Sequence, residues 1–288
     1  MNFTERAEVF SCAGEQLLGI AACPESPMDC GVLIIVGGPQ YRVGSHRQFL
    51  LLARRLAAEG YPSMRFDYRG MGDSGGAMRD FEHVTEDIGA AIEAFQRACP
   101  AVKRVALWGL CDAASAALLY VQASGDPRVT GLALLNPWVR SEASLAQTHI
   151  KHYYGQRLMQ REFWFKLLTG KMKLLKSVRG LLTTAQQARG GRVQTSNESR
   201  SFQDRMAEGL RQFPGRVLLI LSGQDYTAKE FLEFAGLNTA WSGLIEASRV
   251  SRVDVANADH TFSARVQRSA VENETLAWLG GLQGNRAL

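Results

Sequence analysis

Cys111 stands where a strand-like pattern changes directly into a helix-like one. It follows the apolar run Arg104 to Trp108 and Gly109, and it precedes a segment rich in alanine. A reactive atom on such a tight strand-to-helix turn is lifted clear of the sheet, and only small neighbours fit around it. The positive end of the helix dipole there favours the thiolate. Cys111 is therefore a candidate nucleophile, although a lone cysteine is more often a small core residue.

Two more reactive groups follow strand patterns later in the chain. Asp225 comes after Val217 to Leu221, and His260 comes after Val250 to Val255. Sites of open α/β sheets gather at the carboxyl ends of parallel strands. A thiol, an imidazole and a carboxylate at that edge can act as nucleophile, base and orienting group. Asp259 is a competing acid, but consecutive loop residues usually point apart, so Asp225 is the predicted one.

Backbone N–H groups near these residues could stabilise an oxyanion, which needs donors already in place. The N–H of Asp112 follows the nucleophile, and the turn before Tyr41 offers Gly38 or Gln40, because Pro39 has no N–H. The Asp112 carboxylate would raise the thiol pKa if it faced the site. Capping the helix or pairing with a base are its other roles, and the sequence leaves them open.

The elements that must position these groups alternate between strands and helices. Two Ser-x-x-Glu/Gln patterns, at Ser45 and Ser269, predict the first and last helix starts. Residues 6 to 23 alternate loosely and predict an antiparallel edge hairpin. The short apolar runs typical of buried parallel strands are Val32 to Val36, Ser63 to Tyr68, Arg104 to Trp108, Gly131 to Asn136, Val217 to Leu221 and Val250 to Val255. An α/β fold follows, with a mostly parallel sheet and helices on both faces.

The alternation stops between residues 139 and 205, which carry aromatic and basic helical patterns instead. We predict a core formed by 1–138 and 206–288, with 139–205 inserted as a helical cap. The segment holds 13 Lys or Arg and 4 Asp or Glu, which gives it a net charge of +9. Because the whole chain carries +5, the remaining residues carry −4. Such a charge run is usually a solvated helix face. The alternatives are steering of an acidic substrate or peripheral contact with anionic lipid.

Composition and the positions of the cysteines limit the class of protein, its location and its cofactors. The 288 residues are 46% apolar and 21% charged, which is ordinary globular material. No charge-free stretch approaches the ~20 residues of a membrane span, and the N-terminus lacks an export-signal pattern, so we expect a cytoplasmic protein. The five cysteines form no CxxC or zinc pattern, which predicts reduced thiols, no metal and no cofactor. Nucleic acid is not an expected partner, because no recognition motif accompanies the basic residues.

These features together resemble the α/β-hydrolase superfamily over nearly the whole chain, including the order nucleophile, acid, histidine. Residues 66–76 look like that family's loop after the fourth strand. Residues 36–49 with 108–113 are similar to the hydrolase associated with the exosortase A system, type 1. The family's oxyanion position selects Gly38. Cysteine replaces the usual serine, as in dienelactone hydrolase, and Ala113 replaces a glycine although alanine tolerates positive φ poorly.

The resemblance and the residues together predict a Cys-His-Asp hydrolase acting on an ester, thioester or lactone. The resemblance implies a small-molecule or saccharide-linked acyl substrate and a role in exopolysaccharide production. Candidate substrate-binding residues are Gln40, Tyr41, Trp138, Phe163 and Trp164. Two alternatives stay open, namely an acyltransferase that uses the same triad and a non-catalytic hydrolase-like binding scaffold.

Overall fold

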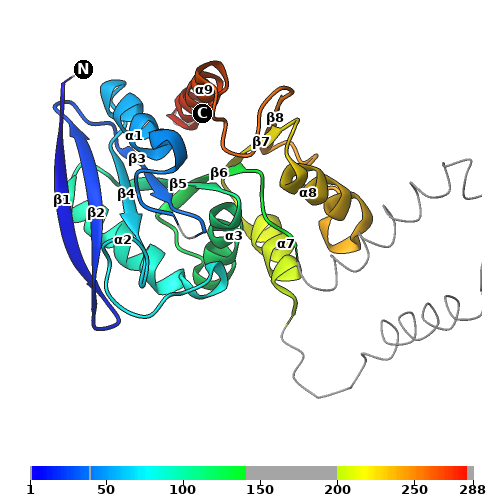
Figure 1. Ribbon diagram of the computed structural model, residues 1–288, viewed down its shortest axis with the longest axis horizontal. Coiled ribbons are helices and arrows are strands. Elements are labelled where there is room, and N and C mark those ends of the chain that lie inside the picture. The colour runs from blue at the N-terminus through cyan, green and yellow to red at the C-terminus, as the bar shows by residue number, and fades with distance from the viewer. Residues whose placement is uncertain (1, 39, 141–199, 284–288) are drawn as a thin grey trace, which may run out of the picture. The chain divides into compact units, whose positions relative to one another are not determined.

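The computed structural model describes residues 2–38, 40–140 and 200–283, and the described residues up to Val139 and from Ser201 belong to one compact unit. Most of the predicted cap, including Phe163 and Trp164, lies outside the described residues. The unit is built on one eight-stranded sheet (Figure 1). Its strands are β1 Phe3–Cys12, β2 Glu15–Pro24, β3 Cys30–Ile35, β4 Ser63–Asp67, β5 Arg104–Leu110, β6 Val129–Leu135, β7 Arg216–Ser222 and β8 Val250–Val255.

The sheet is parallel from β4 to β8 and antiparallel at one edge. The strand order is β1-β2-β4-β3-β5-β6-β7-β8. The antiparallel pairs are β1 with β2 and β2 with β4, and the other neighbours run parallel. All six residues of β3 are buried, as expected for a strand covered on both faces. The predicted edge hairpin and mostly parallel sheet are confirmed.

Helices cover both faces of this sheet (Figure 1). One apolar core contains residues of α1 and α9, and the other contains residues of α2, α3, α7 and α8. Their bounds are α1 Gln48–Ala58, α2 Thr85–Ala98, α3 Asp112–Ser124, α7 Phe202–Gln212, α8 Tyr226–Leu237 and α9 Arg265–Gln283. Within the described ranges, no helix is both long and apolar enough to cross a membrane.

Two predicted helix starts are wrong by about a turn. Before α1, the backbone has positive φ at Gly44, His46 and Arg47, so the α-helix begins at Gln48 and the Ser45 side chain caps nothing. Helix α9 begins at Arg265 and contains Ser269. In both cases a short polar pattern matched a capping box, while the preceding loop decided where helical torsions begin. Helix α7 starts at Phe202, just before the predicted end of the cap at 205.

A buried carboxylate fixes the loops that lead to the sheet's carboxyl edge. Asp67 ends β4 and is fully buried, and it accepts hydrogen bonds from the backbone N–H of Arg42 at 2.8 Å and of Asp73 at 3.2 Å. The Arg42 guanidinium supplies the opposite charge. A buried charge is tolerated only when it is paired and hydrogen-bonded. The segment after β3 and the glycine-rich loop after β4 are therefore held against each other.

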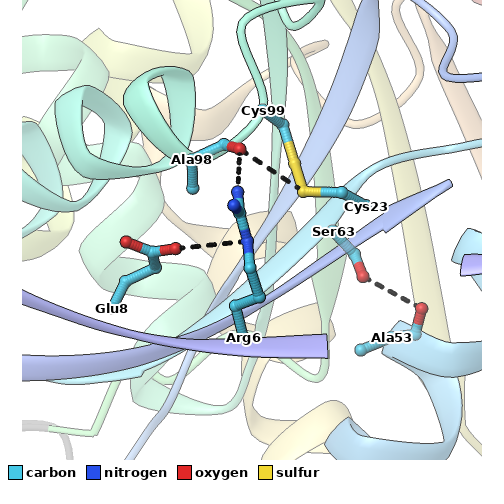
Figure 2. The surroundings of a disulfide bond; sticks show 7 residues. All are labelled: Arg6, Glu8, Cys23, Ala53, Ser63, Ala98 and Cys99. Carbon is cyan, nitrogen blue, oxygen red and sulfur yellow. Dashed lines mark hydrogen bonds and ion pairs between the residues drawn. A yellow bond between two sulfur atoms is a disulfide. The ribbon is translucent and has the colours of Figure 1, made fainter. Parts of the chain in front are cut away.

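The structure joins Cys23 to Cys99 in a disulfide, so the prediction of reduced thiols is wrong for this pair (Figure 2). Cys23 lies in β2 and Cys99 follows α2, with a Cα–Cα distance of 6.1 Å. The two residues are 76 positions apart, so only the packing of α2 against the sheet brings them together. Cys12, Cys30 and Cys111 are free.

We expect three reactive thiols per chain when the protein is denatured without reductant, and five after reduction, measured by thiol-specific chromophore release. Replacing Cys23 and Cys99 together by serine should lower the free energy of unfolding by about 2–4 kcal/mol, because a long loop is no longer closed in the unfolded chain. Urea unfolding under oxidising conditions measures this loss. Five thiols before reduction would contradict the pairing.

Candidate active site

Cys111 occupies a sharp turn between β5 and α3. Its backbone torsions are φ 63° and ψ −125°, a conformation that residues other than glycine rarely adopt. Its N–H donates to the carbonyl of Leu135 in β6 at 2.8 Å, and its own carbonyl accepts from Ala114 at 3.0 Å and from Trp138 at 3.3 Å. The side chain is half-buried. The geometry is that of a nucleophile elbow, in which the strained residue is held by its neighbours.

The small residues around the turn are required by space. A Cβ atom on Gly109 would lie 2.5 Å from the backbone of Ala113, which no real side chain allows. The positive φ falls on Cys111, and Ala113 is an ordinary helical residue. Alanine in place of the second glycine therefore introduces no positive-φ strain.

Asp225 begins α8 and holds two different partners. Its carboxylate accepts from the N–H groups of Thr227 and Ala228, each at 3.2 Å, as a helix N-cap does. The Oδ2 atom lies 2.8 Å from Nδ1 of His260. Burial raises the pKa of Asp225, but the bond to His260 and the two N–H groups outweigh burial, so its pKa is lowered. The carboxylate stays ionised beside the imidazole.

His260 lies in the loop after β8, between Asp225 and Cys111. Hydrogen bonds to the side chains of Asp225 and Cys111 raise its pKa to about 10, against the opposing effect of burial. The structure therefore brings the three predicted residues together, although they come from three separate loops.

The Asp259 side chain forms its hydrogen bonds within its own loop. Its carboxylate accepts from the N–H groups of Thr261 at 3.1 Å and Ser263 at 3.0 Å, and from the Ser263 hydroxyl. These bonds form a local turn after β8. Asp225 is thus the carboxylate that the structure places against the imidazole.

The predicted oxyanion donors already have partners. The Gly38 N–H donates to Oδ2 of Asp112 at 2.8 Å, and the Gln40 N–H donates to the Gly38 carbonyl at 2.7 Å. The Asp112 carboxylate is also held by backbone N–H groups at the start of α3, and within the described residues it forms no ion pair with a basic side chain. It spans from the elbow to the loop after β3. An incoming carbonyl oxygen would meet this carboxylate at the Gly38 N–H.

The predicted pocket residues lie in different settings. The exposed Tyr41 hydroxyl donates to Asp73 at 2.6 Å, and its ring lies 4.3 Å from the Arg42 guanidinium. The Gln40 side chain accepts from Ser45 at 3.4 Å. Trp138 is half-buried and its N–H also donates to Ser115 at 3.0 Å. Tyr41 therefore binds the glycine-rich loop after β4 and Gln40 binds its own loop, while the backbone N–H of Trp138 contacts the nucleophile residue.

Asn136 is a positioning residue that the sequence did not reveal. It is fully buried after β6, with φ 44°, and its amide donates to the Ser222 hydroxyl at 2.8 Å and to the His260 carbonyl at 3.2 Å. Its side-chain oxygen accepts from the Ser222 N–H at 2.9 Å. One side chain therefore ties the ends of β6 and β7 to the histidine loop. A polar residue closing an otherwise apolar strand, just before Pro137, was the available signal.

The described residues contain no group of three or more His, Cys, Asp or Glu side chains arranged to hold a metal ion. The groups that converge at this edge are those of acyl transfer by a nucleophile and a base.

Residues 30–229, well over half of the chain, match the family described as serine aminopeptidase, S33. The chain belongs to this family of α/β hydrolases. The family description names a serine, whereas the residue at the elbow of this S33 hydrolase is Cys111. No curated protein matches the sequence.

Several solved structures share the fold of this S33 hydrolase. Esterase Pf2001 of Pyrococcus furiosus has a TM-score of 0.63 and 16% identity, over 98% of this chain and 91% of that one. The α/β hydrolase GrgF of Penicillium sp. sh18 has the same score and identity, over 98% and 99%. Est1E of Butyrivibrio proteoclasticus, solved with ferulic acid bound, has a TM-score of 0.58 and 14% identity, over 94% and 99%. At these identities the likeness establishes the α/β-hydrolase fold alone.

Asp225→Asn should lower the midpoint of the His260 titration, followed by NMR of the imidazole, by about 1–3 pH units, because the carboxylate that favours the charged ring is gone. Ester turnover should fall by roughly three to four orders of magnitude. Asp259→Asn is the matched control, and it should leave both the titration and the turnover nearly unchanged. The reverse pattern would assign the acid to Asp259.

Proposed function

We propose that the protein is a cysteine hydrolase that cleaves an ester, thioester or lactone through a covalent acyl-enzyme. One observation carries the proposal, namely that Nδ1 of His260 lies 2.8 Å from Oδ2 of Asp225 while the same imidazole interacts with the Cys111 side chain. This is the relation that an activated nucleophile requires. Family membership supports hydrolysis, and the residues themselves support cysteine as the attacking group.

The first half-reaction forms the acyl-enzyme. The Cys111 thiolate forms a bond to the substrate carbonyl carbon, and the carbonyl electron pair moves to oxygen. When the tetrahedral adduct collapses, the bond to the leaving group breaks and that group takes the proton from Nε2 of His260. Asp225 holds Nδ1, so the imidazole keeps the orientation and tautomer that this transfer needs.

The second half-reaction uses the same residues in reverse. Water gives a proton to His260 and attacks the thioester carbon, and the thiolate departs. A thiolate is a good leaving group, so adducts with poor leaving groups return to substrate. Activated acyl groups are therefore better substrates than peptides for a cysteine at this position. An acyltransferase would follow the same steps with an alcohol or amine in place of water.

We extend the proposal to the biological setting. Residues 36–49 and 108–113 resemble the exosortase A-associated hydrolase, which favours a saccharide-linked acyl substrate and a role in exopolysaccharide production. Cytoplasmic residence belongs to this proposal. Peripheral contact with anionic lipid through the basic segment 139–205 also stays a prediction.

Cys111→Ala should reduce hydrolysis of p-nitrophenyl butyrate and a matched thioester to the uncatalysed rate while the circular dichroism spectrum is kept. Cys30→Ala, which removes a buried thiol of β3 away from the site, is the control and should retain activity. An aminoacyl p-nitroanilide tests peptidase activity in parallel. If the anilide is the better substrate, the ester proposal is wrong. If no substrate turns over and iodoacetamide alkylates Cys111 no faster than a free thiol, the scaffold alternative replaces it.

Steering by the basic segment predicts a salt effect. For an anionic acyl substrate, kcat/KM should fall as ionic strength rises from 0.01 M to 0.5 M, because long-range attraction is screened. A neutral ester of the same chain length is the control and should respond little. A flat response for both substrates would remove steering from the proposal and leave the hydrolase itself untouched.

A further inference from the structure

Asp112 places a carboxyl group where the oxyanion of the proposed reaction must bind. The Gly38 N–H, one predicted donor, is 2.8 Å from its Oδ2. The other predicted donor is the backbone N–H of Asp112 itself, which also lies against this carboxylate. The two donors thus converge on an anion that belongs to the chain.

The carboxyl group is closely packed in this position. Oδ1 lies 2.2 Å from where a Cβ atom on Gly37 would stand, so only glycine at that position admits the side chain. Oδ1 is buried, and among the described residues no group forms a hydrogen bond with it.

Asp112, a half-buried residue, differs in its partners from three buried carboxylates. Asp67 pairs with Arg42, Asp87 with Arg69, and Asp225 with His260. Asp112 has backbone N–H groups as its hydrogen-bond partners, and among the titratable side chains Tyr68, which follows β4, and His260 interact with it electrostatically. Burial raises the pKa of Asp112, and the nearby N–H groups and His260 offset only part of that rise.

We propose that Asp112 is a built-in occupant of the oxyanion hole, which competes with the substrate carbonyl oxygen for the Gly38 N–H and must leave it before acyl transfer. This inference rests on the proposed function. Asp112 is the first residue of α3, so rotation of its side chain alone frees the donor while the helix stays in place. A catalytic oxyanion cannot share this N–H with a carboxylate of the same charge.

Three variants, each compared with the native protein, and two reactions test the proposal. The variants are Asp112→Ala, which empties the position, and Asp112→Asn, which keeps its size without its charge. Glu93→Gln removes one charge from the exposed face of α2 and is the matched control. The first reaction is acylation of Cys111, read as the burst of p-nitrophenol from p-nitrophenyl butyrate. The second is alkylation of Cys111 by iodoacetamide, which forms no oxyanion.

We expect the Asp112 substitutions to change the rate of acylation and not the rate of alkylation. Asp112→Ala should acylate at least about tenfold faster than the native protein, since one oxyanion donor is worth roughly 100-fold or more. Asp112→Asn should lie between the two, and Glu93→Gln should match the native protein. Alkylation should change little in all of them. The NMR signal of the Gly38 amide proton should move upfield in Asp112→Ala, because its bond to a charged acceptor is lost.

Several outcomes would overturn the proposal. Acylation that is unchanged or slower in folded Asp112→Ala shows that the carboxyl does not compete with substrate. An equal rise in both reactions assigns the effect to the charge felt by the thiol. A Gly38 amide signal that is the same in all proteins shows that the contact is absent in solution. Should Asp112→Ala not fold, Asp112→Asn decides by the same criteria.

Failure of the proposed function looks different from failure of this inference. If no protein releases p-nitrophenol, hydrolysis by Cys111 is wrong and the competition falls with it. If the native protein reacts and Asp112→Ala is no faster, only the inference falls. If the variants react and the native protein does not, both proposals are supported.

Discussion

The backbone turn at Cys111 is the constraint on which the rest of the site depends. A positive φ at a residue other than glycine costs on the order of 1–3 kcal/mol, and it persists only where the surroundings determine it. Here the N–H of Cys111 continues the pairing of β5 with β6 through Leu135, while its carbonyl receives the first turn of α3. The sheet and the helix therefore impose the turn jointly, and exposure of the thiol is a consequence of the fold.

A small number of side-chain contacts positions the base, His260. Asp225 fixes the start of α8 and the ring of His260 with one carboxylate. Asn136 binds both Ser222 and the backbone of His260. The ends of β6, β7 and β8 are thereby linked through the buried side chains of Asn136, Ser222 and Asp225. Because these polar side chains are buried, loss of one partner would leave another unsatisfied, which makes the loops resist displacement.

The parts of the structure that depend on local pattern could be predicted, and the parts that depend on packing could not. Parallel strands such as β3 are buried on both faces and read as apolar runs, which is why the sheet and the order of Cys111, Asp225 and His260 were foreseen. The start of α1 depends on positive φ angles at His46 and Arg47, which these residue types do not predict. Cys23 and Cys99 meet only through the docking of α2.

At the oxyanion hole, too, the sequence predicts the backbone donor but not the side chain that occupies it. A backbone donor such as Gly38 can be located from the turn that follows a strand. What occupies that donor depends on the side-chain orientation of Asp112 and on the missing Cβ of Gly37, neither of which leaves a periodic signal. The role of Asp112 therefore depends on three-dimensional contacts, which the sequence alone does not reveal.

A cysteine nucleophile is compatible with a neighbouring carboxylate in a way that a serine is not. A neutral serine creates a new negative charge in the transition state, so the field of Asp112 would oppose the whole of that charge. With a thiolate the negative charge is already present, and attack moves it from sulfur to the carbonyl oxygen only a few ångströms away. The carboxylate then raises the energy of ground state and transition state more equally, and only the difference slows the reaction. What Asp112 uniquely obstructs is the Gly38 N–H, because that donor acts on the oxygen and not on the sulfur.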